Sequence, residues 1–337
     1  MSDISALQKF WKKNLDQLPS TPDNIPAFFF AHGSPFLAFS PEAARSLGSS
    51  GALSCVPLRW GGPTGPLAKF LNDFGPVLLK KYQPKGIVVF SAHWETASER
   101  LGMSLVLRVT SHTNSLLVTD YGDENPLLFD YHGFPRELYE LRFKSKGDSA
   151  LSNRVVELYN QAGQLARLSP KLEKCGDDGR GFSGPGLDHG VFVPFRIMFG
   201  DELADIPIVQ VSIDSTLSPE KNWMLGKTVA KLRKEGILVL SGGLTVHNLR
   251  EMESGAPQTA RPQHHAFDMA VIAAVSVADE TERKQAMVGL TKHADFRACH
   301  PREEHFVPLY VAAGAGEGGD AKIIADIYGC ETVAFGL

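Results

Sequence analysis

The chain has 337 residues, of which 43% are hydrophobic and 21% charged, and its formal net charge is −4. This is ordinary globular composition, and without a basic patch it argues against nucleic acid as a partner. No apolar run approaches the roughly 18 residues of a membrane span, so we expect no membrane partner and a cytoplasmic location.

Four cysteines lie far apart and form no CxxC pair, so we interpret them as free thiols of a reducing compartment. They are Cys55, Cys175, Cys299 and Cys330.

The first residues predict a short helix that docks on the rest of the molecule. Ile4, Leu7, Trp11 and Leu15 are spaced for one helix face. A transit peptide is the alternative, but the acidic residues in this stretch count against it. We expect a helical extension over 1–25, followed by one catalytic domain over 26–337.

Three separate apolar runs each end in a histidine. They are Phe28–His32, Gly86–His93 and Gly236–His247. Each is short, rich in β-branched or aromatic residues and bounded by turn residues, as buried strands are. In an α/β sheet, function collects beyond the carboxyl ends of the strands, so these three imidazoles are expected to face one another.

Helical and strand patterns alternate along the remaining chain, with polar connections leading to Asp130. This alternation predicts an α/β fold of a single domain, with a central mixed β-sheet flanked by helices on both faces. A long Gly-, Pro- and Ser-rich loop is expected over 36–66. The other predicted elements are helices over Leu67–Tyr82, from Pro135 toward Phe143, and over Ser152–Leu168, Trp223–Glu235 and Phe267–Ala278, with strands over Ser104–Val109 and Ile206–Asp214.

The histidine pattern suggests a mononuclear metal site, because a neutral imidazole offers a lone pair near neutral pH. A lone histidine at a strand end is more often a structural residue, but three such histidines, each beside small residues, favour metal ligation.

Two GxGxxG matches, at 179–184 and 314–319, do not open a helix after a first strand, so we interpret them as flexible loops. No GxSxG elbow, P-loop or HExxH is present, and strand ends without bridging acids disfavour a two-metal hydrolase.

Two further histidines have suggestive surroundings. His189 follows a Gly/Pro loop and fits a general acid/base, although an Asp188–His189 surface pair would look the same. His305 lies in HPREEHFVPLY, where the charged residues also fit a solvated helix start.

Six motifs in order then make the chain resemble the 4,5-DOPA extradiol dioxygenases, a LigB-type family of class III extradiol ring-cleavage dioxygenases. The resemblance runs from about Pro26 to the C-terminus. The motifs are AHGSP (31–35), SAHWE (91–95), FDYHGFPRELYELRF (129–143), GLDHGVFVPF (186–195), SGGLTVHNLR (241–250) and HPREEHFVPLYVAAGA (300–315).

The resemblance implies a non-haem metal enzyme that opens the ring of a catechol beside its two hydroxyl carbons with O₂. Fe(II) is the expected metal, and a ligand set of three neutral histidines could accept Zn(II) as well. The site residues are assigned as follows: metal ligands His32, His93 and His247; catalytic acid/base and possible fourth ligand His189; substrate-binding His305, Ser34 and Trp94; further pocket walls Pro35, Phe36 and Phe192.

Two other functions stay open at this point. A zinc hydrolase or hydratase could use the same ligands, with a metal-activated water as nucleophile. A silent family member that binds a small aromatic or a protein partner would also keep these motifs.

Overall fold

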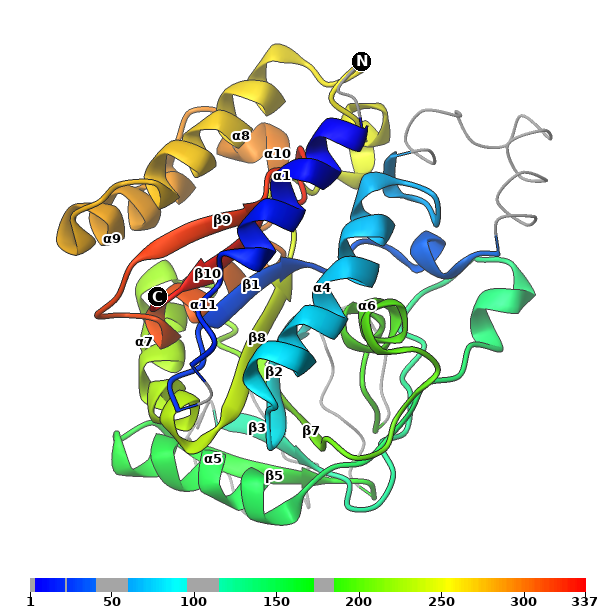
Figure 1. Cartoon of the computed structure of the whole chain (residues 1–337), viewed down its shortest axis with the longest axis vertical. Coiled ribbons are helices and arrows are strands. Elements are labelled where there is room, and N and C mark those ends of the chain that lie inside the picture. The colour runs from blue at the N-terminus through cyan, green and yellow to red at the C-terminus, as the bar shows by residue number, and fades with distance from the viewer. Residues whose placement is uncertain (1–3, 22, 41–59, 96–114, 173–184) are drawn as a thin grey trace, which may run out of the picture.

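A computed structural model describes residues 4–21, 23–40, 60–95, 115–172 and 185–337. Its centre is an eight-stranded mixed sheet in the order β5-β3-β7-β2-β8-β1-β10-β9 (Figure 1). The strands β7, β2, β8 and β1 are parallel neighbours, while β3, β10 and β9 include antiparallel pairings. The strands are β1 (Ala27–Ala31), β2 (Gly86–Glu95), β3 (Leu116–Asp120), β5 (Ala166–Pro170), β7 (Ile208–Ile213), β8 (Ile237–Gly243), β9 (Ala321–Ala325) and β10 (Thr332–Phe335), and a separate two-stranded ladder joins β4 (Lys144–Ser145) to β6 (Glu202–Leu203).

Helices cover both faces of this sheet, so the predicted fold class is confirmed. Successive residues of a strand point to opposite faces. Phe28 and Phe30 accordingly pack in the core cluster formed with α1, α4 and α6, while Phe29 joins the cluster formed with α5, α7, α8 and α11. The helices are α1 (Ile4–Asp16), α4 (Pro66–Tyr82), α5 (Ser149–Gln161), α6 (His189–Phe199), α7 (Pro219–Val229), α8 (Pro262–Val275), α9 (Glu280–Gly289), α10 (Phe296–Cys299) and α11 (Pro308–Ala315).

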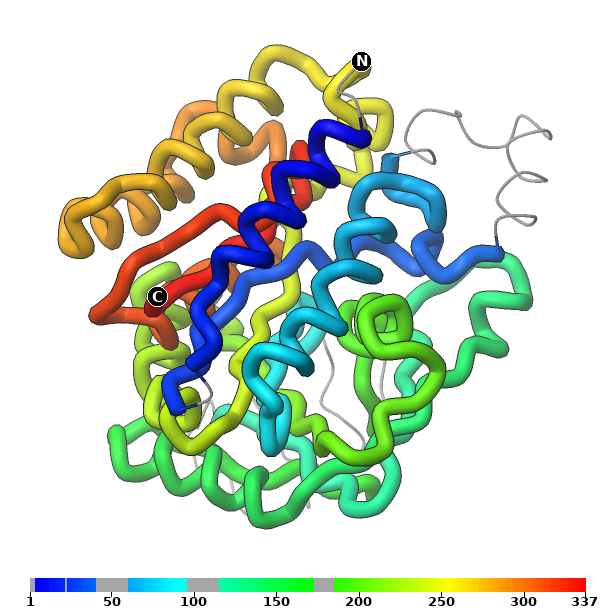
Figure 2. The backbone as a smooth tube through the Cα atoms, in the orientation of Figure 1, coloured from blue at the N-terminus to red at the C-terminus, as the bar shows by residue number. Residues whose placement is uncertain are grey.

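The N-terminal helix docks as predicted. α1 runs beside α4 and beside β9 near the other end of the chain (Figure 2). Trp11 is fully buried, packs edge-on against Phe70 and donates its indole N–H to Asp73 at 2.9 Å. Because α1 covers β9, it protects the edge strand of the sheet from pairing with other chains.

One expectation for the segment between Asp148 and Leu187 needs correction. The predicted helix over Ser152–Leu168 ends at Gln161, and residues 166–170 form β5 instead. Gly163 adopts φ +75°, a conformation that ends the helix despite the continuing amphipathic spacing. The released segment then pairs in parallel with β3.

The polar connection expected before Asp130 was also wrong, because it contains β3. The predicted helix from Pro135 is only a 3₁₀ turn over Arg136–Tyr139, after which the chain extends into β4. The predicted strand over 104–109, the Gly motif at 179–184 and most of the 36–66 loop lie outside the described residues. The second Gly motif begins at Gly314, inside the last turn of α11, so it does not open a helix.

None of the helices in the described ranges is both long and apolar enough to cross a bilayer.

Candidate metal centre

Three neighbouring parallel strands deliver the predicted histidines to one edge of the sheet. His32 directly follows β1, His93 lies near the end of β2, and His247 lies four residues beyond β8. Because β8 is hydrogen-bonded to both β1 and β2, the carboxyl ends of all three strands meet. The sheet topology therefore brings the three histidines to the same end of the sheet, but His247 falls in a different donor group from His32 and His93.

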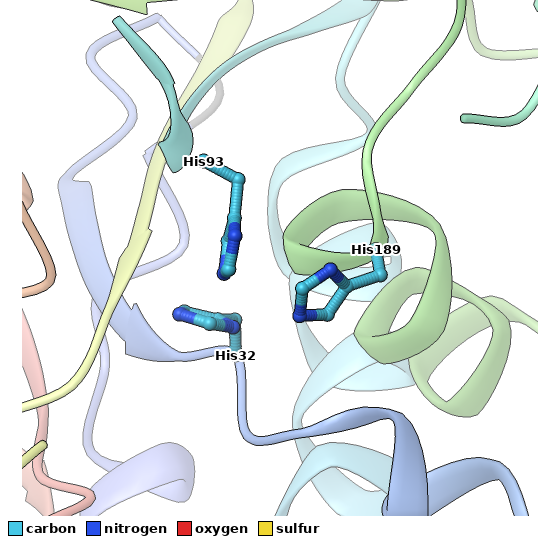
Figure 3. Close-up of side chains that lie close together, drawn as sticks. All are labelled: His32, His93 and His189. Atoms are coloured by element: carbon cyan, nitrogen blue, oxygen red, sulfur yellow. The ribbon is translucent and has the colours of Figure 1, made fainter. Parts of the chain in front are cut away.

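His189 reaches His32 and His93 from a different direction, and these three histidines form one donor group. It is the first residue of α6, and its imidazole points toward His32 and His93 (Figure 3). The ring centroid of His93 lies 4.0 Å from that of His189 and 5.0 Å from that of His32. One donor atom from each of the three residues lies within 4.8 Å of the others, and all three side chains are buried.

His247 lies in an adjacent donor group, with Glu304 and His305. Its ring stacks on His305 with centroids 3.6 Å apart. The Nε2 atom of His305 is in turn 3.2 Å from Nε2 of His93. His305 therefore lies between the two groups, and five imidazoles form one continuous cluster.

The chemistry of His32 fits a metal ion. It is almost fully buried, and within the described ranges neither of its ring nitrogens has a hydrogen-bond partner. Burial, followed by the charges of His93, His189 and His247, holds the pKa of His32 well below its usual value. A buried neutral imidazole with an unused lone pair is what a borderline metal such as Zn(II) or Fe(II) binds.

Asp130 is a site residue that the sequence reasoning missed. One carboxylate oxygen lies 2.7 Å from Nδ1 of His189, and the other lies 3.3 Å from Nδ1 of His93. Burial acts to raise the pKa of Asp130, but the charge and hydrogen bond of His189, with those of His93, hold it well below its usual range. Asp130 is therefore an anionic partner shared by two of the clustered imidazoles.

A second buried carboxyl supports the start of α6. Asp188 caps the helix by accepting from the backbone N–H of Gly190, and it also accepts from the Ser91 hydroxyl at 2.7 Å. Burial and the charge of Asp130 raise its pKa to about 6. Asp188 and His189 are both buried, so the surface-pair interpretation does not hold.

Charged residues tie the His305 segment to β2. Arg302 donates two hydrogen bonds to Glu95 and approaches Glu304 at 3.5 Å. Glu304 in turn lies 3.1 Å from Nδ1 of His305. Glu304 therefore links His305 to Arg302, which is itself paired with Glu95 of β2, so these charged residues have partners within the fold.

Aromatic side chains form a cluster that contacts His189 through Tyr131. Tyr131 meets the His189 ring edge-on at 5.4 Å, and Phe129 meets Phe192 at 5.2 Å. Phe36 packs on Phe134 at 4.9 Å.

Two other predicted pocket residues, Ser34 and Trp94, closely follow candidate ligands in the chain. Ser34 is half-buried two residues after His32 and precedes the 3₁₀ turn Pro35–Ala38. Trp94 is buried beside Leu117 of β3. Contact of these side chains with a substrate stays a prediction.

Comparison with known families shows to which family the chain belongs. Residues 61–335 match the family model described as the catalytic LigB subunit of aromatic ring-opening dioxygenase. The chain belongs to the LigB family. The family resemblance predicted from the sequence motifs is therefore confirmed.

Relatives of this LigB-family chain match nearly its whole length. It is 37% identical to a 4,5-DOPA dioxygenase extradiol-like protein of Schizosaccharomyces pombe, over 97% of both chains. It is 28% identical to the 4,5-DOPA dioxygenase extradiol of Beta vulgaris, over 93% of this chain and 96% of the other. The crystal structure of an uncharacterized Escherichia coli K12 protein has the same fold, with a TM-score of 0.58 at 23% identity over 93% of this chain and 100% of the other.

Proposed function

We propose that this protein is a metal-dependent extradiol dioxygenase that opens the aromatic ring of a catechol with O₂. LigB-family membership supports the reaction class. The observation that carries the proposal is the buried imidazole group, in which both nitrogens of His32 lack a partner among the described residues. Relatives named for 4,5-DOPA make DOPA and related o-diphenols the substrates to test first.

We assign His32, His93 and His247 as the metal ligands, with His189 close enough to be a fourth. Support comes from their arrival at one sheet edge and from the 5.0 Å between the ring centroids of His32 and His93. The donor atom of His189 shares a group with His32 and His93, whereas that of His247 lies in the adjacent group. The ligand test therefore treats His247 and His189 separately.

A bound Fe(II) would supply the one-electron chemistry that lets O₂ react with a catecholate. The protein's own residues would handle the protons. His189 would accept a proton from a catechol hydroxyl and return it later in the reaction, while Asp130 steadies the opposite nitrogen of its ring. Tyr131, Phe129 and Phe192 would flank the substrate ring and exclude water.

The test is anaerobic reconstitution with Fe(II), followed by O₂ uptake against a panel of catechols that includes DOPA. We expect O₂ consumption and a ring-opened semialdehyde with Fe(II), and binding without turnover with Zn(II), because zinc does not change oxidation state. Hydrolysis by zinc-loaded protein without O₂ uptake would favour a zinc hydrolase. Tight catechol binding without turnover with either metal would favour a silent binding member.

Ligand identity is tested by metal analysis of single alanine variants after dialysis. We expect His32→Ala, His93→Ala and His247→Ala each to lose the metal, with the fate of His189→Ala deciding whether it is a fourth ligand. Full metal content in the first three would refute the ligand assignment. The cytoplasmic location stays a prediction from composition.

A further inference from the structure

Asp130 contacts two imidazoles that reach the site from different elements. Its Oδ1 accepts a hydrogen bond from the backbone N–H of His189 at 2.9 Å and lies 2.7 Å from Nδ1 of the same residue. Its Oδ2 lies 3.3 Å from Nδ1 of His93. One buried carboxylate thus reaches the Nδ1 side of a β2 residue and of an α6 residue.

An ionised carboxylate can only accept hydrogen bonds, so the nitrogen that faces it must carry the hydrogen. For His93 and His189 that nitrogen is Nδ1. The Nε2 atom of each neutral ring is then left with its lone pair. The contact between Nε2 of His93 and Nε2 of His305 shows that this side of His93 faces the interior of the cluster.

The backbone holds Asp130 in register with His189. Leu127 and Leu187 form a parallel bridge, and Leu128 N–H donates to Leu187 at 2.8 Å. Gly186 permits this approach, because a Cβ there would lie 2.6 Å from the backbone nitrogen of Leu128 and its φ is +148°. The two segments are therefore fixed to each other two residues away from the Asp130–His189 contact.

We propose that Asp130 is a positioning residue that sets His93 and His189 in the same tautomer, with hydrogen on Nδ1 and the Nε2 lone pair directed inward. The inference rests on the proposed function for the roles of a metal ligand and an acid/base. The inference adds that a single carboxylate sets the tautomer of both His93 and His189. Carboxylate partners of this kind orient a ligating histidine and raise its basicity.

The decisive variant is Asp130→Asn, which keeps the shape of the side chain. If its amide oxygen keeps the Oδ1 position, it still accepts from the backbone and the ring of His189. Its NH₂ group would then face Nδ1 of His93 as a donor and favour hydrogen on Nε2 of that ring. Nitrogen-15 NMR of metal-free protein at mildly alkaline pH reports the tautomers directly. Spectra of His189→Gln and His93→Gln assign the two signals.

We expect Nδ1–H on both rings of the wild type. In Asp130→Asn we expect Nε2–H on His93 and unchanged Nδ1–H on His189, with Zn(II) affinity about 10–100-fold weaker by chelator competition. Asp130→Glu restores a carboxylate and should restore Nδ1–H. Asp73→Asn is the matched control, since Asp73 accepts hydrogen bonds from Trp11 and Gln8. It should leave both tautomers and the zinc affinity unchanged.

Hydrogen on Nε2 of both wild-type rings would overturn the proposal, and this measurement stands even if Asp130→Asn does not fold. An Asp130→Asn protein that keeps wild-type tautomers and binds zinc within twofold of wild type would also overturn it. Neither readout uses turnover. Wild-type protein that shows the expected tautomers but opens no catechol would refute the proposed function and leave the role of Asp130 intact.

Discussion

Gly190 lies so close to His93 that any side chain at position 190 would clash with the His93 ring. A Cβ at position 190 would stand 2.8 Å from Cδ2 of His93 and 2.8 Å from the Ser91 hydroxyl oxygen. The second residue of α6 therefore packs directly on the β2 segment that carries a candidate ligand. The absence of a side chain at 190 is what brings His189 within 4.0 Å of His93, measured between ring centroids.

Gly190→Ala should therefore displace His93 and weaken metal binding. We expect about a 10–100-fold loss of Zn(II) affinity, similar to the loss of an outer-shell partner, by chelator competition. Gly289→Ala is the control, because a Cβ there meets nothing within 4 Å and the backbone has an ordinary helical φ of −66°. Equal affinity in Gly190→Ala and wild type would mean that His93 does not bind the metal in this orientation.

His189→Gln should separate chemistry from binding. Loss of a positioned acid/base typically costs about 10²–10⁴ in rate, so kcat should fall by that factor while Fe(II) content and catechol affinity remain. Steady-state O₂ uptake and metal analysis on the same preparation give both numbers. If metal and activity are lost in parallel, His189 is a resting-state ligand, and His305 becomes the next candidate for the acid/base.

Much of this site was predictable from the sequence, and the reasons are local. His32 and His93 end apolar runs of strand length, so their position at the sheet edge follows from the runs themselves. His189 stands out because a Gly/Pro loop precedes it. His305 stands out less, since its neighbours Glu304 and Arg302 look like a solvated helix start until Glu95 is seen opposite them.

Asp130 could not be found in this way. It lies in irregular backbone without periodicity, and its contacts with His93 and His189 exist only because residues 127–128 pair with Leu187. The end of α5 was missed for a related reason. Amphipathic spacing continues past Gly163, and only pairing with β3 makes the next residues a strand.

Glu331→Gln should flatten the dependence of stability on pH. Burial, followed by the charge of Asp268, holds the pKa of Glu331 well above its usual value. The folded state thus keeps a proton that the unfolded chain loses above its usual pKa of 4.5, so the free energy of unfolding falls as pH rises beyond it. One such proton corresponds to a slope of up to about 1.4 kcal/mol per pH unit.

The measurement is urea unfolding of wild type and Glu331→Gln from acidic to alkaline pH. The amide oxygen of the variant side chain can still accept from the Thr245 hydroxyl that pairs with Glu331. The variant should therefore fold, and gain relative to wild type at higher pH. Glu235→Gln, at a surface carboxylate that pairs with Arg154, serves as the control. Parallel slopes for wild type and Glu331→Gln would refute the expected proton retention.

Trp11→Ala should destabilise the fold without emptying the site. Replacing a fully buried tryptophan with alanine typically costs about 3–5 kcal/mol. Trp11→Phe keeps most of the packing and loses the hydrogen bond to Asp73, for about 1 kcal/mol. Urea unfolding measures both, and metal content should stay at the wild-type level. A cost below about 1 kcal/mol for Trp11→Ala would show that α1 docks only loosely.

Because of the order of the central strands, the candidate histidine ligands come together only when the whole sheet is folded. Neighbours in the sheet come from positions 27–31, 86–95 and 237–243, so no short fragment contains the site. A metal that binds only this assembly acts as a folding ligand, and at about a hundred times its Kd it would add about 2.7 kcal/mol to stability. Metal supply would then set the stability of the fold as well as the occupancy of the site.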